Sequence, residues 1–392
     1  MREVWIVSAC RTAIGSFGGS LKDVSAWQLG VTAAKEAIKR AGVDVNEFDD
    51  VLIGNCMMRS DEINVARCIG LDAGIPDSCP AATIQRQCSS SMQALVFAYQ
   101  QIAMGENDTV LVGGVENMSR VPYALYDMRF GKRMFDGKAT DTLTQGLTDP
   151  IYGIMMGITA ENLAEKHNIS REAQDELALT SHSRAEAAIN AGRFKDEIVP
   201  VEIPQRKGDP KIFDTDEHVR LGLTMEQLGK LKPAFKKDGT VTAGNASGIN
   251  DGASAGVVMA AEKAKALGLK PLARIVSHAV AGVDPRIMGY GPVPAIRKAL
   301  ERAKMSLSDI QLIELNEAFA AQYLACEMDL DLNREITNVN GSGIALGHPV
   351  GATGFRVVVS LLHEMEKRDL TLGIGSMCVG GSMGKAVIVE RI

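Results

Sequence analysis

The sequence lacks the features of membrane-spanning, secreted and nucleic-acid-binding proteins. No stretch reaches the roughly 18 apolar residues that a transmembrane helix needs. The N-terminus passes from Met1 directly into the apolar segment 4–7, without the charged and apolar regions of a signal peptide. Lys and Arg number 42 against 48 Asp and Glu, and this net charge of −6 gives no electrostatic reason to bind nucleic acid or anionic membranes. We therefore expect a soluble, cytoplasmic protein that binds neither.

The cysteines are unsuited to a disulfide framework or a zinc site. There are seven, an odd number, at positions 10, 56, 68, 79, 88, 326 and 378. No two of them have the C-x-x-C spacing of zinc ligands, so we expect no metal. What the sequence has in excess is glycine, at 39 of 392 residues, against an average usage of about 7%.

Short apolar runs alternate with amphipathic segments along most of the chain. Strands are predicted at 5–8, 51–53, 109–112, 275–277, 312–315 and 372–377, and helices at 26–41, 92–104, 293–303 and 354–367. This alternation predicts a layered α/β fold. The segment 119–245 breaks the rhythm and contains a long helix that starts at Ser170 and ends at Gly192. We interpret this segment as an insertion over the core.

Three pairs of segments recur in the same order along the chain. Segments 37–41 and 51–55 resemble 299–303 and 312–316, segment 107–113 resembles 369–375, and segment 6–8 recurs at 275–277. We interpret the repeat as two duplicated α/β halves. The predicted divisions are a first half at 1–118, completed by about 246–270, an inserted loop domain at 119–245, and a second half at 271–392.

Cys88 stands directly before the helix predicted at 92–104. The positive end of the helix dipole and its free backbone N–H groups favour thiolate over thiol. Cys88 is therefore a candidate nucleophile. The alternative is a small buried hydrophobic residue, which is the usual place of a free cysteine.

His348 lies in the segment 340–354, which holds five glycines. Glycines let the backbone approach a ligand closely. If the repeat holds, position 350 corresponds to position 88, so His348 and Cys88 lie at equivalent helix ends and could face each other. A histidine beside a cysteine is the general base that makes thiolate. The alternative is a structural histidine in a tight turn.

Cys378 and Asn316 follow two other predicted strands. Cys378 precedes a glycine-rich hairpin turn, whose backbone N–H groups could form half of an oxyanion hole. The alternative is a plain hairpin with an incidental cysteine. Asn316, at the end of strand 312–315, could hold a water or a carbonyl oxygen, or it could cap the next helix.

Together these motifs resemble the thiolases, the acetyl-CoA acyltransferases, along essentially the whole chain. The matching segments, in order, are 11–19, 113–119, 156–162, 242–248, 316–319, 347–349 and 378–381. The resemblance implies an α/β fold, a five-layered α-β-α-β-α sandwich of two βαβαβαββ halves with an inserted loop domain. It also implies an acyl-CoA:acetyl-CoA C-acyltransferase that condenses acetyl-CoA with an acyl-CoA, or cleaves a 3-oxoacyl-CoA, through an acyl-Cys88 intermediate. CoA thioesters would be its substrates, with no separate cofactor.

The resemblance also implies a role for each site residue. Cys88 would accept the acyl group, His348 would activate Cys88, and Cys378 would exchange the α-proton of acetyl-CoA. Asn316, through a water, and His348 would bind the enolate oxygen, and the backbone N–H groups of Cys88 and Gly380 would form the other oxyanion hole. Seven residues are expected to contact CoA: Leu147, Met156, Phe235, Ala243, Ser247, Ala318 and Phe319.

Two other functions remain open from the residues alone. A condensing enzyme of the ketoacyl-synthase type shares the duplicated fold, but it lacks a reactive second cysteine, so Cys378 argues against it. A non-catalytic acyl-CoA or lipid-binding protein would be expected to lose Cys88, His348 or Cys378, and this chain keeps all three. The resemblance further implies a homodimer or a dimer of dimers, and segment 121–138 is long enough to link dimers, so we expect a homotetramer.

Four residues depart from the family pattern. Ser91, Ser342 and Ser382 stand where glycine is common, and serine is strained wherever φ is positive. Met155 stands where acetyl-specific members commonly carry histidine. We expect these four to alter the acyl pocket, and Met155 favours a pocket that tolerates an acyl group larger than acetyl.

Overall fold

The computed structural model describes all 392 residues. Most of the strands belong to one mixed sheet. Its strands are β1 (Val4–Thr12), β3 (Asp50–Gly54), β4 (Ala81–Ile84), β5 (Thr109–Asn117), β11 (Asn250–Ala260), β12 (Ala273–Gly282), β13 (Leu312–Leu315), β14 (Leu372–Val379) and β15 (Met383–Glu390). They are ordered β13-β14-β15-β12-β1-β11-β5-β3-β4, and the short β2 (Gly15–Ser16) and β8 (Ile198–Val199) pair with β11 and β1. The first half thus supplies one end of the sheet and the second half the other.

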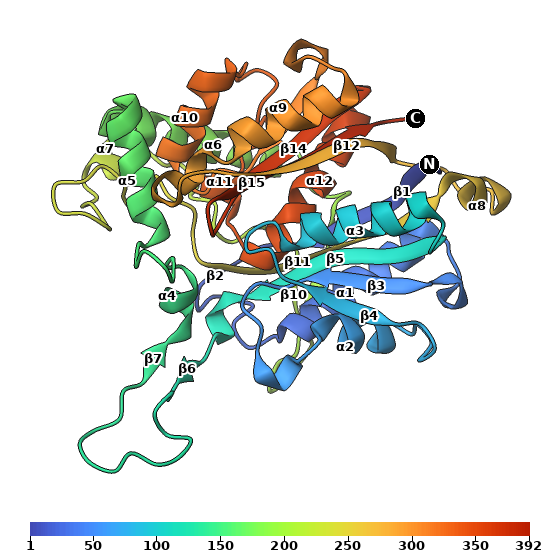
Figure 1. The fold of residues 1–392 in the computed structure, drawn as a ribbon, viewed down its shortest axis with the longest axis horizontal. Helices are drawn as coiled ribbons and strands as arrows, with labels where there is room; N and C mark the ends of the chain where they lie inside the picture. Colours follow the sequence, from blue (N-terminus) through green and yellow to red (C-terminus); the bar gives the residue numbers. More distant parts are fainter.

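Helices cover both halves and fill the space between them (Figure 1). The outer helices of the first half are α1 (Ala26–Ala41) and α2 (Val65–Asp72), the central pair is α3 (Ser90–Met104) and α12 (Val350–Lys367), and the second half carries α9 (Pro292–Ala303) and α10 (Ala320–Leu330). Three large hydrophobic clusters lie between these layers, and the middle one joins α3 and α12 to strands of both halves. This arrangement is the predicted five-layered α-β-α-β-α sandwich.

The duplication is visible in the details of the strands. The first strand of each half has a β-bulge, next to Ser8 in β1 and next to Ser277 in β12. The Ser8 hydroxyl donates to the Ala37 carbonyl at 2.7 Å, and the Ser277 hydroxyl donates to the Ala299 carbonyl at 2.9 Å. Ala37 and Ala299 are themselves a repeat pair, so both halves join strand to helix in the same way.

The insertion is built of short elements around two longer helices. They are β6 (Tyr123–Ala124), β7 (Thr140–Asp141), α4 (Thr142–Gly146), α5 (Met156–His167), α6 (Arg171–Asn190), β9 (Val201–Ile203), β10 (Lys211–Phe213) and α7 (Met225–Gly229). The ribbon of β6 and β7 projects away from the body (Figure 1). Two further short helices are α8 (Ala261–Ala266) and α11 (Gly343–Leu346).

Strand β11 was not predicted, although it is buried along its whole length. Its sequence begins Asn-Asp-Gly-Ala-Ser-Ala-Gly, which is depleted in the β-branched and aromatic residues that mark strands. The small residues are needed because the neighbouring backbones lie close. A Cβ on Gly256 would lie 2.4 Å from the Ser8 carbonyl oxygen.

Helix α12 starts at Val350, four residues before the predicted start. The sequence did not predict the first turn because it contains Gly351 and is followed by Gly354, and glycine is a poor helix former. The structure uses one of them for packing, since a Cβ on Gly354 would lie 2.6 Å from the Met92 backbone nitrogen. The first turns of α3 and α12 therefore cross in close contact.

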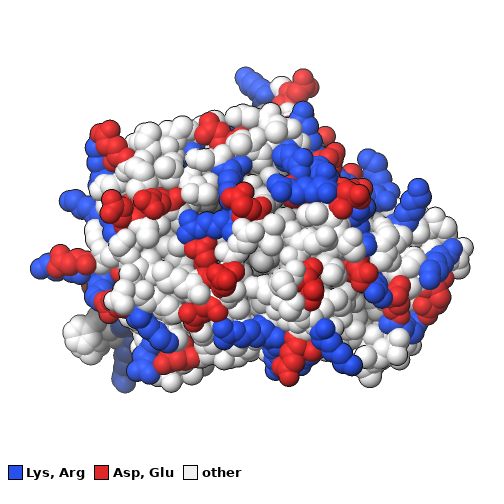
Figure 2. Space-filling view, turned by 90° about the horizontal axis from the view of Figure 1, so that it is seen from above, with Lys and Arg blue, Asp and Glu red and all other residues white.

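None of the helices is both long and apolar enough to span a bilayer. On the face shown in Figure 2, acidic and basic side chains are interspersed, with uncharged surface between them.

Candidate active site

A cavity of about 210 Å³ lies where the first turns of α3 and α12 meet the turn between β14 and β15. Fourteen of its 19 lining residues are hydrophobic, and Cys88, His348 and Cys378 are among the 19. Val350 lines it too, at the position that the repeat pairs with Cys88. Three reactive side chains that are far apart in the sequence thus share one apolar cavity.

Six of the seven residues predicted to contact CoA also line this cavity: Leu147, Met156, Phe235, Ser247, Ala318 and Phe319. The Phe235 and Phe319 rings pack edge to face, with centroids 6.1 Å apart. Ala243 does not line the cavity but is exposed, and its carbonyl accepts a hydrogen bond from Arg220 at 3.2 Å. Asn316 is not among the residues that line the cavity either, and its side chain is completely buried.

The surroundings of the two cavity thiols differ from the sequence-based expectation. Burial raises the pKa of Cys88, and hydrogen bonds from the backbone N–H groups of Gly380 and of Cys88 itself lower it only in part. Burial and the neighbouring Cys88 raise the pKa of Cys378 well above its ordinary value. The helix end therefore does not by itself make Cys88 a thiolate, and the nucleophile needs a base.

The hydrogen bonds of His348 define its tautomer. The Thr353 hydroxyl donates to the Pro349 carbonyl at 2.8 Å, so its oxygen accepts from His348 Nδ1–H at 2.7 Å. This leaves Nε2 unprotonated, and Nε2 has no hydrogen-bond partner in the protein. Burial, with the nearby charge of Arg356, lowers the pKa of His348 to about 3. His348 is thus a neutral imidazole with a free basic nitrogen.

We expect Thr353→Val to slow the activation of Cys88 by about tenfold or more. Valine cannot accept a hydrogen bond from His348 Nδ1–H, so the imidazole can also adopt the tautomer in which Nε2 carries the proton and cannot act as the base. The measurement is the rate at which acetyl-CoA acylates Cys88. Thr353→Ser keeps the hydroxyl and is the matched control. Equal rates in the valine and serine variants would contradict this role.

Two further residues that the sequence did not single out hold the catalytic loops. The His348 backbone N–H donates to Asn250 Oδ1 at 2.9 Å, and a Cβ on Gly347 would lie 2.7 Å from the Asn250 Cγ. Buried Glu116 accepts from the Gly351 N–H at 2.9 Å and from backbone N–H groups of the first half. Burial raises the pKa of Glu116 to about 7, and these donors oppose the rise. Glu116 lies inside a family motif, which was its only sequence signal.

The three serines that replace glycines do not line the cavity. Ser91 lies within α3, and its oxygen accepts from the Phe355 N–H of α12 at 2.9 Å. Ser342 is extended and donates to a buried carbonyl. Only Ser382, in the hairpin turn, has a positive φ, of 65°. The three serines therefore do not touch the cavity directly, and their effect on acyl specificity stays a prediction, whereas Met155 does line the cavity.

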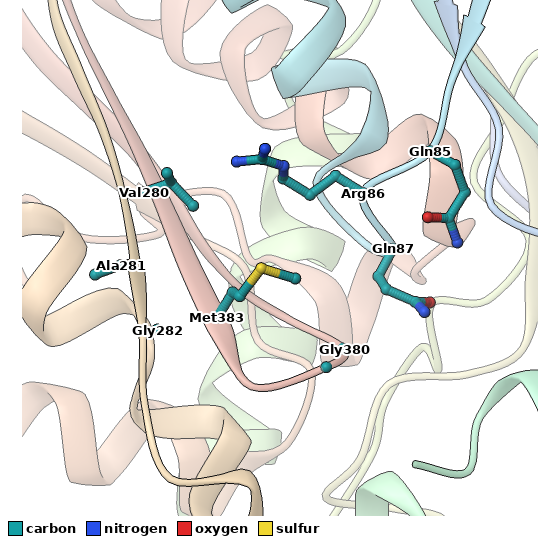
Figure 3. Close-up of a pocket in the computed structure, with 9 residues that line it drawn as sticks. Gln85, Arg86, Gln87, Val280, Ala281, Gly282, Gly380 and Met383 are labelled. Atoms are coloured by element: carbon teal, nitrogen blue, oxygen red, sulfur yellow. The ribbon is translucent and has the colours of Figure 1, made fainter. Parts of the chain in front are cut away.

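A wider hollow of about 520 Å³ lies beside the turn that carries Gly380 (Figure 3). Its only ionisable lining residue is Arg86, and no cysteine or histidine lines it. It therefore offers neither a nucleophile nor a base. No three His, Cys, Asp or Glu side chains are gathered as metal ligands would be.

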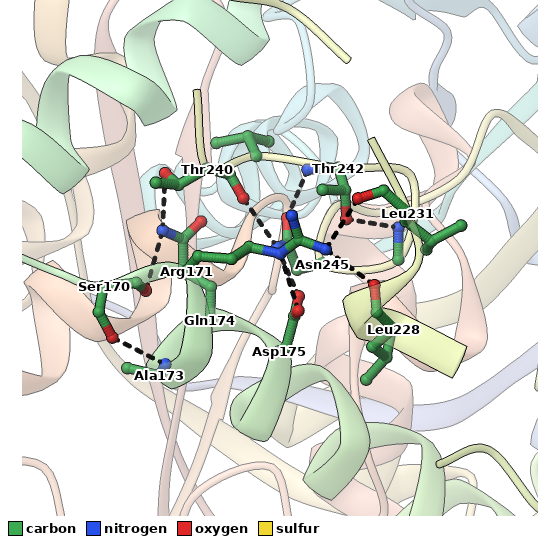
Figure 4. Close-up of polar contacts among 12 residues, drawn as sticks. Ser170, Arg171, Ala173, Gln174, Asp175, Leu228, Leu231, Thr240, Thr242 and Asn245 are labelled. Atoms are coloured by element: carbon green, nitrogen blue, oxygen red, sulfur yellow. Dashed lines mark hydrogen bonds and ion pairs between the residues drawn. The ribbon is translucent and has the colours of Figure 1, made fainter. Parts of the chain in front are cut away.

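A polar network holds the segment 242–248, of which residues 246–248 line the cavity (Figure 4). Arg171 Nε pairs with Asp175 Oδ2 at 2.7 Å, and its Nη2 donates to two backbone carbonyls. Asp175 Oδ1 in turn accepts from Asn245 Nδ2 at 2.8 Å, and Asn245 Oδ1 accepts from the Thr242 N–H at 2.8 Å. The insertion thus fixes the backbone that carries Ser247 into the cavity wall.

Comparisons with known proteins cover the whole chain. The family described as "Thiolase, N-terminal domain" matches residues 4–262, and "Thiolase, C-terminal domain" matches residues 269–391. The acetyl-CoA acetyltransferase of Cupriavidus necator is 52% identical over 392 residues, which is 100% of both chains. The crystal structure of the Bacillus anthracis acetyl-CoA acetyltransferase superposes with a TM-score of 0.98 at 55% identity, over 100% of this chain and 99% of that one. Human mitochondrial 3-ketoacyl-CoA thiolase in complex with CoA gives a TM-score of 0.96 at 48% identity, over 100% and 98% of the two chains.

Proposed function

This chain belongs to the thiolase family and is an acyl-CoA:acetyl-CoA C-acyltransferase, and we propose that Cys88, His348, Cys378 and Asn316 carry out its reaction. The reaction is the reversible Claisen condensation of acetyl-CoA with an acyl-CoA, or the thiolysis of a 3-oxoacyl-CoA. The observation that supports these residue roles is that two thiols and one neutral imidazole line the same apolar cavity.

In the first half of the reaction, His348 Nε2 takes the proton of the Cys88 thiol. The thiolate attacks the carbonyl carbon of the acyl-CoA, and the backbone N–H groups of Cys88 and Gly380 stabilise the negative oxygen. The carbon–sulfur bond to CoA then breaks, and the CoA sulfur takes up the proton held by His348. The products are free CoA and acyl-Cys88.

In the second half, His348 Nε2 takes the proton of the Cys378 thiol, and the Cys378 thiolate removes an α-proton from acetyl-CoA, which restores the thiol. The enolate oxygen is stabilised by His348 and, through a water, by Asn316. The α-carbon attacks the acyl carbon on Cys88 and a carbon–carbon bond forms. The bond from that carbon to the Cys88 sulfur breaks, and the sulfur takes up the proton held by His348, so that both thiols are restored. Because the steps are reversible, thiolysis follows the same path backwards.

We propose that the pantetheine arm of CoA occupies the cavity between Phe235, Ser247 and Phe319, and that no separate cofactor takes part. A cytoplasmic location is supported by the seven free cysteines, because disulfides form in oxidising compartments. The repeat supports the proposed division into 1–118 with 246–270, the loop domain 119–245, and 271–392.

The test is to incubate the protein with acetyl-CoA, quench, and map the peptides by mass. We expect one acetyl group, bound as a thioester to Cys88, together with release of an equal amount of free CoA. Acetoacetyl-CoA formation with the acetyl group on another cysteine, or with none, would contradict the proposed nucleophile.

We also propose that copies of the chain assemble through the sheet edge at β4 and through the ribbon at 121–138. The ribbon exposes seven large hydrophobic side chains, among them Phe130 at 98% and Phe135 at 90%. Large hydrophobic side chains exposed together on one short segment favour a protein contact there.

Replacing Phe130 and Phe135 together by serine is expected to convert a tetramer into a dimer that keeps its activity. Light scattering coupled to size exclusion measures the mass. Leu267→Ser, which changes an exposed hydrophobic residue at the end of α8, away from both proposed contacts, is the control and should stay tetrameric. A dimeric wild type, or a tetrameric double variant, would overturn the role of the ribbon.

A further inference from the structure

Buried polar atoms without protein partners gather around Asn316, where the end of β13 meets α12. Glu314 in β13, Asn316 directly after β13 and Arg356 in α12 are each at most 2% exposed. Glu314 Oε2, Asn316 Nδ2, and Arg356 Nε and Nη1 have no partner in the protein. One direct hydrogen bond joins members of this group, from Arg356 Nη2 to Asn316 Oδ1 at 3.0 Å.

We propose that Arg356 is a positioning residue, which orients the Asn316 amide so that Nδ2 remains available as a donor for the enolate half of the reaction. A guanidinium only donates hydrogen bonds, whereas an amide accepts through oxygen and donates through nitrogen. Oδ1 must therefore face Arg356, because the flipped amide would place donors against donors. This proposal rests on the proposed function of the cavity.

A backbone hydrogen bond and the space left by Gly343 hold Asn316 in this position. Its backbone N–H donates to the Ser376 carbonyl at 3.0 Å, which aligns the end of β13 with β14. A Cβ on Gly343 would lie 2.7 Å from Asn316 Oδ1, so the absence of a side chain there leaves room for the amide. The amide is thus fixed at its backbone and at its oxygen, while its nitrogen has no protein partner. A buried donor of this kind is normally satisfied by an ordered water or a ligand oxygen.

The other fully buried arginine shows what a structural role looks like. Arg11 pairs with Glu197 at 2.6 Å and with Asp216 at 2.7 Å. Arg356 makes no such ion pair, and Glu314 acts on its charge only from a longer distance. The one side-chain hydrogen bond that Arg356 makes therefore goes to a neutral amide, that of Asn316.

The experiment compares Arg356→Met with Arg11→Met, the same change at both buried arginines. Two rates are measured on folded protein, the acylation of Cys88 by acetyl-CoA and the condensation to acetoacetyl-CoA. In Arg356→Met we expect condensation to fall about 100-fold, the effect of losing one oxyanion donor. Acylation should not fall by more than about threefold, because loss of the Arg356 charge makes His348 more basic rather than less. In Arg11→Met we expect a lower melting temperature and the same change in both rates.

A double-mutant cycle separates positioning from general damage. If Arg356 acts through Asn316, then Arg356→Met in an Asn316→Ala background should cost less than about twofold in addition. Should Arg356→Met not fold, Arg356→Lys takes its place, since lysine keeps one donor and should give a smaller loss confined to condensation. Equal losses in both rates, or additive losses in the cycle, would overturn the proposal. A wild type that is not acylated on Cys88 would instead refute the proposed function.

Discussion

Replacement of Cys88 by serine is expected to lower both condensation and thiolysis by about 10⁴-fold or more, and to leave no acetyl group on the protein. A hydroxyl holds its proton far more tightly than a thiol does. Transfer of the proton to His348 is therefore much less favourable from the serine hydroxyl than from the thiol, with the same imidazole as acceptor. The readouts are the steady-state rates and the intact mass after incubation with acetyl-CoA.

The matched control is Cys10→Ala. It removes a thiol that is buried in the hydrophobic cluster between α1 and the strands of the first half and that donates to the Ala33 carbonyl. It should reduce stability but leave turnover per folded molecule unchanged. If Cys88→Ser still formed acetyl-protein at the wild-type rate, another residue would be the nucleophile.

Replacement of Cys378 by alanine should divide the reaction into its two halves. We expect condensation and thiolysis to fall by about 10³-fold to 10⁴-fold, because the α-proton of acetyl-CoA then has no base. Acylation of Cys88 should continue within about tenfold of the wild type, since His348 and the N–H group of Gly380 are untouched. A single-turnover release of CoA measures acylation, and acetoacetyl-CoA formation measures condensation.

This variant discriminates between the enzyme classes that the sequence left open. Condensation that survives in Cys378→Ala would show that the second thiol is not the base. The reaction would then resemble the ketoacyl-synthase pattern, in which a cysteine works with a histidine and a second histidine or an asparagine.

The sequence was sufficient for elements whose signals are local. Helix α1 has its predicted bounds because Ser25 and Gln28 form a capping box and Gly42 ends the helix with a φ of 65°. Strand β13 also has its predicted bounds. Strand β11 and the first turn of α12 could not be predicted, because their residues are small where a neighbouring backbone packs against them. Such contacts leave no periodic pattern in the sequence.

The same distinction applies to the site. Cys88, His348 and Cys378 stand in recognisable loops, so their positions could be read from motifs and from the repeat. Thr353, Asn250 and Arg356 could not, because each acts on a segment that only the fold brings near. Their own neighbours in the sequence say nothing about a histidine tautomer or an amide orientation.

The placement of Cys88 and Val350 in one cavity, at equivalent ends of α3 and α12, bears on why a duplicated chain is useful. Two identical halves in a symmetric pair would carry the same residue at both helix ends. Joining the halves in one polypeptide lets the ends diverge, so that one end keeps the thiol while the other becomes an apolar wall beside the imidazole. It also means that a molecule is active only when both halves are folded, because the nucleophile lies in one half and its base in the other.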